Sequence, residues 1–157
     1  MFAGRLTQAA LRGLDWLAAK TLAPEDIPRH LLVGQRGEEA AYFYLRRRGY
    51  TIIARNYRSP QHRGELDLVG WDGDVLCVIE VKTRTSHDVK SAEAAVDRDK
   101  QRELTMVARD FVRQMPRSCQ WRFDVLAVYY ERGNRRPSFE LFQNAFTVSY
   151  NHAFAKS

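Results

Sequence analysis

The clearest hydrophobic pattern in the chain lies in two short runs, residues 64–71 and 74–82, in which apolar and charged positions alternate. Asp72-Gly73 lies between them. Asp-Gly between apolar runs predicts a two-residue hairpin turn, because both turn residues need positive φ. Successive side chains of a strand point to opposite faces of a sheet, so one face of this hairpin is expected to be apolar and to lie against a core. That face carries Leu66, Leu68, Val75, Cys77, Ile79 and Val81.

The other face of the hairpin gathers ionisable residues. With this turn, the expected facing pairs are Trp71 with Asp74, Val69 with Leu76, Asp67 with Val78, and Glu65 with Glu80. Asp67 and Glu80 are then diagonal neighbours about 7 to 8 Å apart, and Lys82 projects from the same side. Directly opposed carboxylates repel at a cost of about 0.2 to 1 kcal/mol, so we expect a positive charge to offset them.

This set of side chains suggests a divalent metal beside a phosphate. Carboxylate oxygens suit hard cations such as Mg²⁺ or Mn²⁺, and the carboxylates of Asp67 and Glu80 can close around one ion. Lys82 adds a compact positive charge that can position a water or neutralise charge on a phosphate. The spacing alone leaves open a second interpretation, in which Lys82 only forms a rim salt bridge with the acids.

The rest of the chain predicts a single α/β domain. Helical periodicity covers residues 34–48, where Gly49 ends the helix, and residues 91–115, where Pro116 stops it. Strands are expected at 50–57, 121–130 and 138–143. Residues 5–20 have the spacing of an amphipathic helix, and 21–30 are expected to form a linker. The expected domains are an N-terminal helix and linker at 1–30, one globular domain at 31–148 and a tail at 149–157.

Composition favours an anionic partner. The 157 residues carry a net charge of +6, with 20 Arg against 5 Lys. Arginine offers a planar fork suited to phosphate oxygens, so a nucleic acid is the natural inference, although mildly basic domains without such a partner are common. No apolar run approaches the roughly 18 residues that span a bilayer. Cys77 and Cys119 belong to no CxxC pair, so we expect a cytoplasmic protein without membrane contact.

A family resemblance rests on several short motifs together. They are Gly34-Gln35-Arg36-Gly37-Glu38, Asn56-Tyr57-Arg58, Gly64-Glu65-Leu66-Asp67, Ile79-Glu80-Val81-Lys82-Thr83-Arg84, Lys100, Arg122-Phe123-Asp124 and Asn144-Ala145-Phe146. Over roughly residues 31–148, the chain resembles the YraN-like family of uncharacterised bacterial proteins. That family is similar to the PD-(D/E)XK nucleases and, among them, to archaeal Holliday junction resolvases. The resemblance implies a restriction-endonuclease-like αβββαβ core with a mixed central sheet flanked by helices.

The resemblance also implies roles for individual residues. Asp67 and Glu80 would bind Mg²⁺ or Mn²⁺, Lys82 would assist the attacking water, and Glu38 would be a further metal ligand or organiser of the catalytic site. Leu66 replaces the proline that gives the superfamily its name. For Glu38 another explanation stays open, since an acid in the first turn of a helix favours the helix dipole by about 0.3 to 1 kcal/mol. Glu39 could also exchange roles with it.

Four further residues are candidates for nucleic-acid binding. Asn56, Arg58 and Arg84 lie near the charged end of the expected strands, where they would bind backbone phosphates or cover the rim. The resemblance marks Lys100 as a phosphate contact, and a solvated helix face is the alternative. Asp124 alternates with apolar residues and is expected to be the buried partner of an arginine rather than a metal ligand. Two histidines, His62 and His87, flank the open end of the hairpin.

Three functions remain open on the sequence alone. The leading hypothesis is a Mg²⁺- or Mn²⁺-dependent endonuclease that hydrolyses phosphodiesters in DNA, with branched DNA as one substrate and a homodimer as the form suggested by the resolvases. The second is a nucleic-acid-binding module that keeps the nuclease scaffold without catalysis. The third is an interaction protein that docks through its N-terminal helix. Phosphate-loop, serine-hydrolase and dinucleotide motifs are lacking, which argues against those chemistries.

Overall fold

The elements of the protein follow the order expected from the sequence. The computed structural model describes residues 29–85, 96–131 and 136–147. The elements are α2 (Arg29–Arg47), β1 (Thr51–Tyr57), β2 (Leu66–Asp72), β3 (Val75–Arg84), α3 (Arg98–Arg113), β4 (Gln120–Tyr129) and β5 (Ser138–Phe146). Contacts within the chain define two compact units, residues 1–36 and residues 37–157. The side-chain contacts described below all lie within residues 37–157.

The strands form one mixed sheet in the order β1-β2-β3-β4-β5. β3 pairs with β4 in parallel, whereas the other three pairs are antiparallel. The parallel pair needs a crossover connection, and α3 lies within that connection. The resulting αβββαβ order, extended by β5, is an α/β fold consistent with a restriction-endonuclease-like core.

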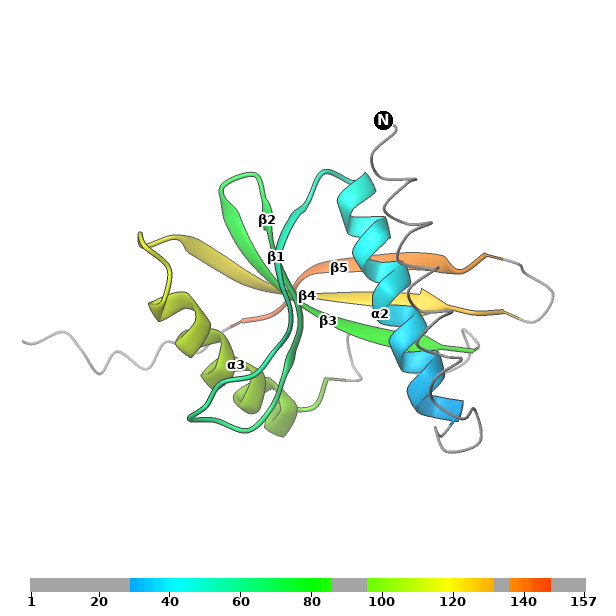
Figure 1. Ribbon diagram of the computed structural model, residues 1–157, viewed down its shortest axis with the longest axis horizontal. Helices are drawn as coiled ribbons and strands as arrows, with labels where there is room; N and C mark the ends of the chain where they lie inside the picture. Colours follow the sequence, from blue (N-terminus) through cyan, green and yellow to red (C-terminus); the bar gives the residue numbers. More distant parts are fainter. Residues whose placement is uncertain (1–28, 86–95, 132–135, 148–157) are drawn as a thin grey trace, which may run out of the picture. The chain divides into compact units, whose positions relative to one another are not determined.

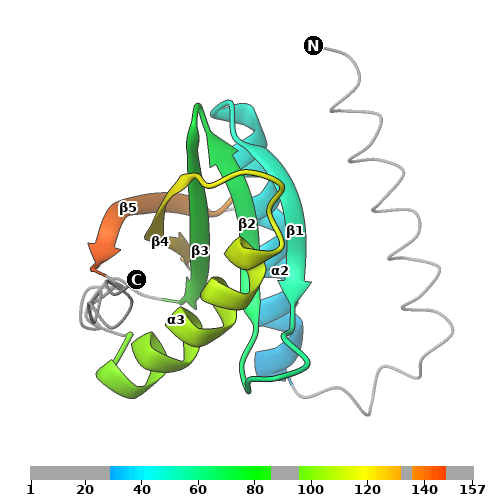
Figure 2. The same ribbon diagram turned by 90° about the vertical axis from the view of Figure 1, so that its left-hand side faces the viewer.

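Two hydrophobic clusters lie on the two faces of the sheet. Figure 2 shows α3 in front of the sheet and the C-terminal half of α2 behind it. Ala41 and Leu45 of α2 pack in one cluster with Cys77 and Ile79 of β3. Leu104, Val107 and Ala108 of α3 pack in the other cluster, whose sheet residues include Leu76, Val78, Phe123 and Val125. Fully burying one such aliphatic side chain contributes about 1.5 to 3 kcal/mol, so both helices are held mainly by packing.

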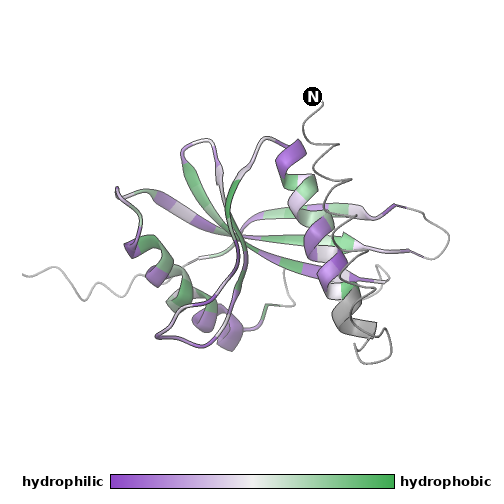
Figure 3. Ribbon diagram, in the orientation of Figure 1, coloured by the Kyte–Doolittle hydropathy of each residue, from purple (hydrophilic) through white to green (hydrophobic). Residues whose placement is uncertain are grey.

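Figure 3 shows that the central parts of the strands labelled in Figure 1 are largely hydrophobic, whereas hydrophilic residues occur at strand ends and on the helices. Seven of the ten residues of β4 and five of the ten residues of β3 are buried, as expected for parallel neighbours covered on both faces. Glu80 is a buried charge within this apolar run. Among the helices of the described residues, none is both long and apolar enough to cross a membrane.

The structure corrects the expected hairpin turn. Gly73 and Asp74 form the turn in place of Asp72-Gly73, and only Gly73 has positive φ, at 59°. A positive φ at the first central residue alone is the pattern of a type II′ turn, which favours glycine there. The register therefore differs from expectation by two residues, with Trp71 opposite Leu76 and Val69 opposite Val78. A shift of two preserves the side of the sheet on which each side chain lies.

Several element boundaries also differ from those expected. α2 begins by Arg29 and includes His30, which was assigned to a linker. α3 begins at Arg98 rather than at Ser91, because the Asp97 side chain caps it by accepting a hydrogen bond from the Lys100 N–H. It ends at Arg113, before Pro116.

Two strand predictions were wrong in detail. β5 extends to Phe146 instead of ending at Gln143. Leu66 packs in the α3-side cluster instead of with Leu68, at the point where β2 pairs with the irregular end of β1 around Asn56, whose φ is 50°. The expected N-terminal helix at 5–20, the tail and His87 lie outside the described residues.

Candidate functional site

Asp67 lies where the hairpin opens. The backbone pairing of β2 with β3 runs from Asp72 opposite Val75 to Leu68 opposite Ile79, and the next positions outward are Asp67 and Glu80. There the Val81 N–H donates to Oδ2 of Asp67 at 2.7 Å. The Asp67 side chain thus accepts a hydrogen bond from β3 beyond the last backbone pair of the two strands. This bond fixes the carboxylate beside Val81, the residue that follows Glu80.

Glu80 and Lys82 form the second part of the site. Nζ of Lys82 donates to Oε1 of Glu80 at 2.7 Å, and the two side chains are 22% and 6% exposed. The other carboxylate oxygen, Oε2, is buried and has no hydrogen-bond partner among the residues that the structure describes. Burying a charged oxygen without a partner is unfavourable, so this atom is available to a ligand that brings positive charge.

Glu38 is brought near this site by close packing of α2 on β3. The preceding residue is Gly37, and a Cβ added there would overlap the side chain of Thr83, the neighbour of Lys82. Burial raises the pKa of Glu38, and the nearby charges of Glu65 and Glu80 raise it further, whereas Arg55 lowers it. Glu38 is therefore an electrostatic neighbour of the site, as the resemblance implied, and its role as a ligand stays a prediction.

Asp67 and Glu80 lie where β2 and β3 separate, a place called the fork below. Their carboxylates repel one another. Burial raises the pKa of Asp67 to about 7, and the charges of Glu80 and Glu38 contribute to the increase. The hydrogen bond from Val81 and the charge of Lys82 act in the opposite direction without cancelling it. A carboxylate with a raised pKa beside a second buried carboxylate and a lysine is typical of functional sites, because such an arrangement costs stability unless a ligand offsets it.

The donor atoms at the fork suit a hard cation. Asp67 and Glu80 supply only carboxylate oxygens, and the unpartnered Oε2 of Glu80 fits a metal ligand. Across residues 29–85, 96–131 and 136–147, no three His, Cys, Asp or Glu side chains are grouped so that they could hold one ion. This arrangement matches Mg²⁺, which usually binds through one or two carboxylates and keeps water or phosphate oxygens as its other ligands.

The four candidate nucleic-acid contacts occupy different positions. Arg58 is 78% exposed and pairs with Glu65 through its Nη2 at 2.5 Å. Asn56 is exposed on β1, and Lys100 is half-buried in the first turn of α3. Arg84 ends β3, and its buried Nε has no hydrogen-bond partner in the described part of the chain. Glu80 and Arg84 thus carry an unpaired acceptor and an unpaired donor four residues apart on one strand.

A cluster that the sequence analysis did not predict fastens the β1–β2 loop to α3. Oγ of Ser59 donates to Oδ2 of Asp110 at 2.5 Å, and Nδ1 of His62 lies 2.6 Å from the same oxygen. Arg113 reaches the other oxygen at 3.3 Å. Ser59 contacts the aspartate rather than the histidine, so the three do not form a nucleophile-base relay. The one sequence signal that pointed to this cluster is Asp110, a charged residue three positions after Val107 on the apolar face of α3.

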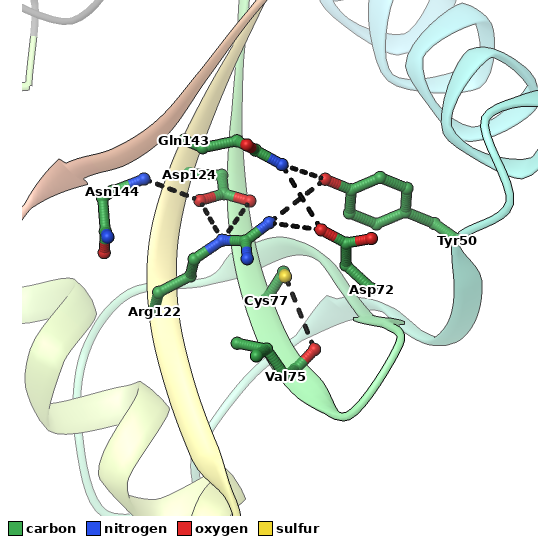
Figure 4. A network of polar contacts seen from close by, with 8 residues as sticks. All are labelled: Tyr50, Asp72, Val75, Cys77, Arg122, Asp124, Gln143 and Asn144. Atoms are coloured by element: carbon green, nitrogen blue, oxygen red, sulfur yellow. Dashed lines mark hydrogen bonds and ion pairs between the residues drawn. The ribbon is translucent and has the colours of Figure 1, made fainter.

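A second polar network lies toward the turn end of the hairpin (Figure 4). Asp124 is fully buried, and Nε of Arg122 donates to both of its oxygens, at 2.9 and 3.1 Å. This confirms the expectation that Asp124 is the buried partner of an arginine. Arg122 also donates to Asp72 at 2.7 Å, and Gln143 of β5 donates to Tyr50 at 3.0 Å. The network joins β2, β4, β5 and the segment after α2.

Comparisons with known proteins agree with the motifs. Residues 37–128 match the uncharacterised protein family UPF0102. A UPF0102 protein of Koribacter versatilis is 49% identical over 144 residues, covering 91% of this chain and 96% of that protein. A UPF0102 protein of Solibacter usitatus is 41% identical, covering 85% and 98%. One from Caldicellulosiruptor saccharolyticus is 39% identical, covering 73% and 96%. The chain therefore belongs to the uncharacterised bacterial protein family UPF0102, the YraN-like family that its motifs indicate.

Proposed function

We propose that this protein is a metal-dependent nuclease that hydrolyses phosphodiester bonds in DNA, with branched DNA among its substrates. The observation that carries the proposal is the buried oxygen of Glu80, which has no protein partner and lies on the same carboxylate that holds Lys82. Asp67 is fixed next to it by Val81. A purely structural salt bridge between Lys82 and Glu80 would leave the buried, unpaired oxygen of Glu80 unexplained.

Asp67 and Glu80 are the residues that would hold the cation. When bound there, Mg²⁺ or Mn²⁺ would supply Lewis-acid stabilisation of a phosphoryl oxygen and lower the pKa of a bound water. The Val81 N–H keeps the Asp67 carboxylate in place before any ligand arrives. Glu80 presents Oε2 to the site while Oε1 holds the lysine.

Lys82 contributes positive charge at a fixed position. Its ammonium lies 2.7 Å from the Glu80 carboxylate, and its side chain is largely buried, so the charge is weakly screened by water. It is placed to orient an attacking water and to neutralise charge that develops on the phosphate. Glu38, whose charge acts on Asp67, would organise the site rather than join Asp67 and Glu80 on one ion, since no three such side chains are so grouped in the described residues. Asn56, Arg58, Arg84 and Lys100 contact the phosphates that flank the scissile bond.

The proposal includes the cell compartment and the assembly. Both Cys77 and Cys119 are free, as expected for a reducing compartment, so we place the activity in the cytoplasm. A four-way DNA junction presents two equivalent strands for cleavage, and a protein that resolves it needs two sites. We therefore expect a homodimer on such DNA, which light scattering of the protein–junction complex would detect as two chains per junction.

A cleavage assay with matched variants tests the proposal. Metal-free protein is titrated with Mn²⁺ in a calorimeter, and cleavage of labelled linear and four-way branched DNA is followed with and without Mn²⁺. The variants Asp67→Asn, Glu80→Gln and Lys82→Met should each lower the cleavage rate by at least 100-fold, about 2.7 kcal/mol of activation free energy. The first two should also lose Mn²⁺ binding. Asp74→Asn at the turn of the same hairpin is the control, with wild-type behaviour expected.

The assay also separates the alternative function. Cleavage that survives in pure Asp67→Asn protein would remove the mechanism. If wild-type protein binds DNA in EDTA but cleaves neither substrate with Mn²⁺, the protein is a binding module on a nuclease scaffold. The gathering of acids around Lys82 favours the enzyme, because a surface that only binds polyanions gains nothing from buried carboxylates.

A further inference from the structure

Two groups of arginines among the described residues differ in the partners that hold them. One group pairs with carboxylates, in the pairs Arg58–Glu65, Arg102–Asp99, Arg113–Asp110 and Arg122–Asp124. The other group is held by tyrosines and consists of Arg46, Arg48 and Arg55. A carboxylate partly offsets the charge of a guanidinium, whereas a neutral ring positions the guanidinium without offsetting its charge. The tyrosine-held arginines therefore keep their positive charge for an external anion.

Tyr42 of α2 holds two of these arginines from two different elements. Nη1 of Arg46 donates to the Tyr42 hydroxyl at 3.2 Å, and its guanidinium lies 5.7 Å from the ring centroid. Arg55, on β1, places its guanidinium 4.7 Å from the same ring. Both arginines are exposed, whereas Tyr42 is half-buried. One fixed aromatic ring thus aligns two solvent-facing guanidinium groups across the gap between α2 and β1.

This pair of arginines adjoins the candidate catalytic site. Glu38, Tyr42 and Arg46 follow one another at intervals of four residues, so they lie along one flank of α2 over about 12 Å of helix axis. The charge of Arg55 acts on Glu38. A single nucleic-acid strand carries one phosphate per about 3.4 Å of duplex axis, so the flank spans about three phosphates.

The third tyrosine-held arginine lies on the opposite flank of the helix. Nη1 of Arg48 donates to the Tyr44 hydroxyl at 3.3 Å. Tyr44 stacks on Phe139 of β5, with ring centroids 4.3 Å apart. β1 and β5 are the two outer strands of the sheet, so Arg48 and Arg55 lie toward opposite edges. Arg48 therefore has the same chemistry as Arg46 without the neighbouring acidic site.

We propose that Arg46 and Arg55, aligned by Tyr42, form a track that binds the sugar-phosphate backbone of a nucleic acid and leads it to the site of Asp67 and Glu80. The inference deepens the proposed function and rests on it for the identity of the substrate. The track contacts phosphates rather than bases, because the Tyr42 ring is already occupied by guanidinium groups. Binding along it is consequently independent of base sequence and strongly dependent on salt.

Equilibrium binding in EDTA tests the track without requiring cleavage. Fluorescence anisotropy with a labelled DNA duplex gives the slope of log Kobs against log salt for each full-length variant. Arg46→Gln combined with Arg55→Gln should weaken binding and reduce the magnitude of the slope by about 1.8, since each phosphate contact contributes about 0.9. Tyr42→Phe keeps the ring and removes only the hydroxyl, so it should reduce affinity less than the double variant. Arg48→Gln is the matched control and should leave the slope unchanged.

The outcomes distinguish this inference from the proposed function. An unchanged slope in the double variant overturns the track, and so does an equal loss in Arg48→Gln. If the double variant loses binding while wild-type protein fails to cleave DNA, the nuclease proposal fails and the track stands. If wild-type protein cleaves DNA and the double variant keeps the same KM and salt slope, the nuclease stands and the track fails. Circular dichroism of each variant confirms that the fold is kept.

Discussion

Asp67 and Val81 are joined by a 2.7 Å hydrogen bond at the point where β2 and β3 separate. The bond keeps an acidic side chain beside a buried strand that also carries Glu80, although the two carboxylates repel. An asparagine at position 67 could still accept this bond, whereas an alanine could not. Comparison of Asp67→Asn with Asp67→Ala therefore separates the loss of the negative charge from the loss of the hydrogen bond to Val81.

The stability of the protein should fall as the pH rises from about 4 to about 7. Asp67 has a folded pKa of about 7, against an ordinary aspartate pKa of 3.8. Between these values the native state binds a proton that the unfolded state has lost, so the free energy of unfolding decreases with pH. Denaturant unfolding at a series of pH values measures this decrease. Asp67→Asn should be less sensitive to pH over this interval.

Divalent metal should reverse that trend above pH 7. Mn²⁺ that binds only the native state raises the free energy of unfolding by RT ln(1 + [Mn²⁺]/Kd). The increase should be present in wild-type protein and Asp74→Asn, and absent in Asp67→Asn. An equal increase in Asp67→Asn would place the metal elsewhere.

Gly37→Ala should destabilise the protein by about 1 to 3 kcal/mol, although alanine is the better helix former. The added methyl group would overlap Thr83, so α2 must move away from β3 and carry Glu38 with it. Thermal unfolding measures the loss, and Thr83→Ala in the same chain should restore part of it. Gly34→Ala in the same helix is the control, because nothing among the described residues lies within 4 Å of its added Cβ. Equal effects of the two glycine variants would contradict the close packing.

Asp110→Asn should loosen the β1–β2 loop. The hydrogen bonds from Ser59 and His62 lower the pKa of Asp110, so its ionised form is favoured in the native state. This contribution to stability is present above the ordinary aspartate pKa of 3.8 and is lost as the pH falls through the lower folded pKa. Hydrogen exchange read by mass spectrometry should show faster exchange in residues 58–65 of the variant at pH 7. Unaltered exchange there would mean that Asp110 does not fasten the loop.

Arg122→Met should cost about 3 to 5 kcal/mol of stability, because it leaves the fully buried Asp124 without its cation. Denaturant unfolding measures the loss. Arg117→Met, an exposed arginine in the loop before β4, is the control and should change stability by less than about 0.5 kcal/mol. Adding Asp124→Asn to Arg122→Met should recover part of the stability, since the uncompensated charge is removed.

The sequence was sufficient to predict the fold class and the grouping of the acids. Alternation predicted that Asp67 and Glu80 lie close together, and in the structure the charge of Glu80 acts on Asp67, although Leu66 leaves the face that alternation assigned to it. The prediction of the turn residues was wrong because Asp-Gly and Gly-Asp both suit two-residue loops. Local sequence could not decide between them; cross-strand packing did.

Contacts between distant segments could not be predicted. Ser59 and Asp110 are 51 positions apart, and neither belongs to a recognisable motif. Tyr42 and Arg55 meet only because α2 lies against the sheet beside β1. The helix start at Arg98 was missed for a local reason, since Asp97 stops the periodicity by capping.

The Arg122 network and the acidic fork occupy different ends of the same hairpin, with Asp72 about 17 Å along β2 from Asp67. A buried ion-pair network and the proposed metal-binding carboxylates thus lie apart, so we expect that selection or protein engineering can adjust heat tolerance at one end without disturbing the other. We therefore expect differences among homologues in this network to correlate with growth temperature rather than with substrate preference. The positions concerned are Tyr50, Asp72, Asp124 and Gln143.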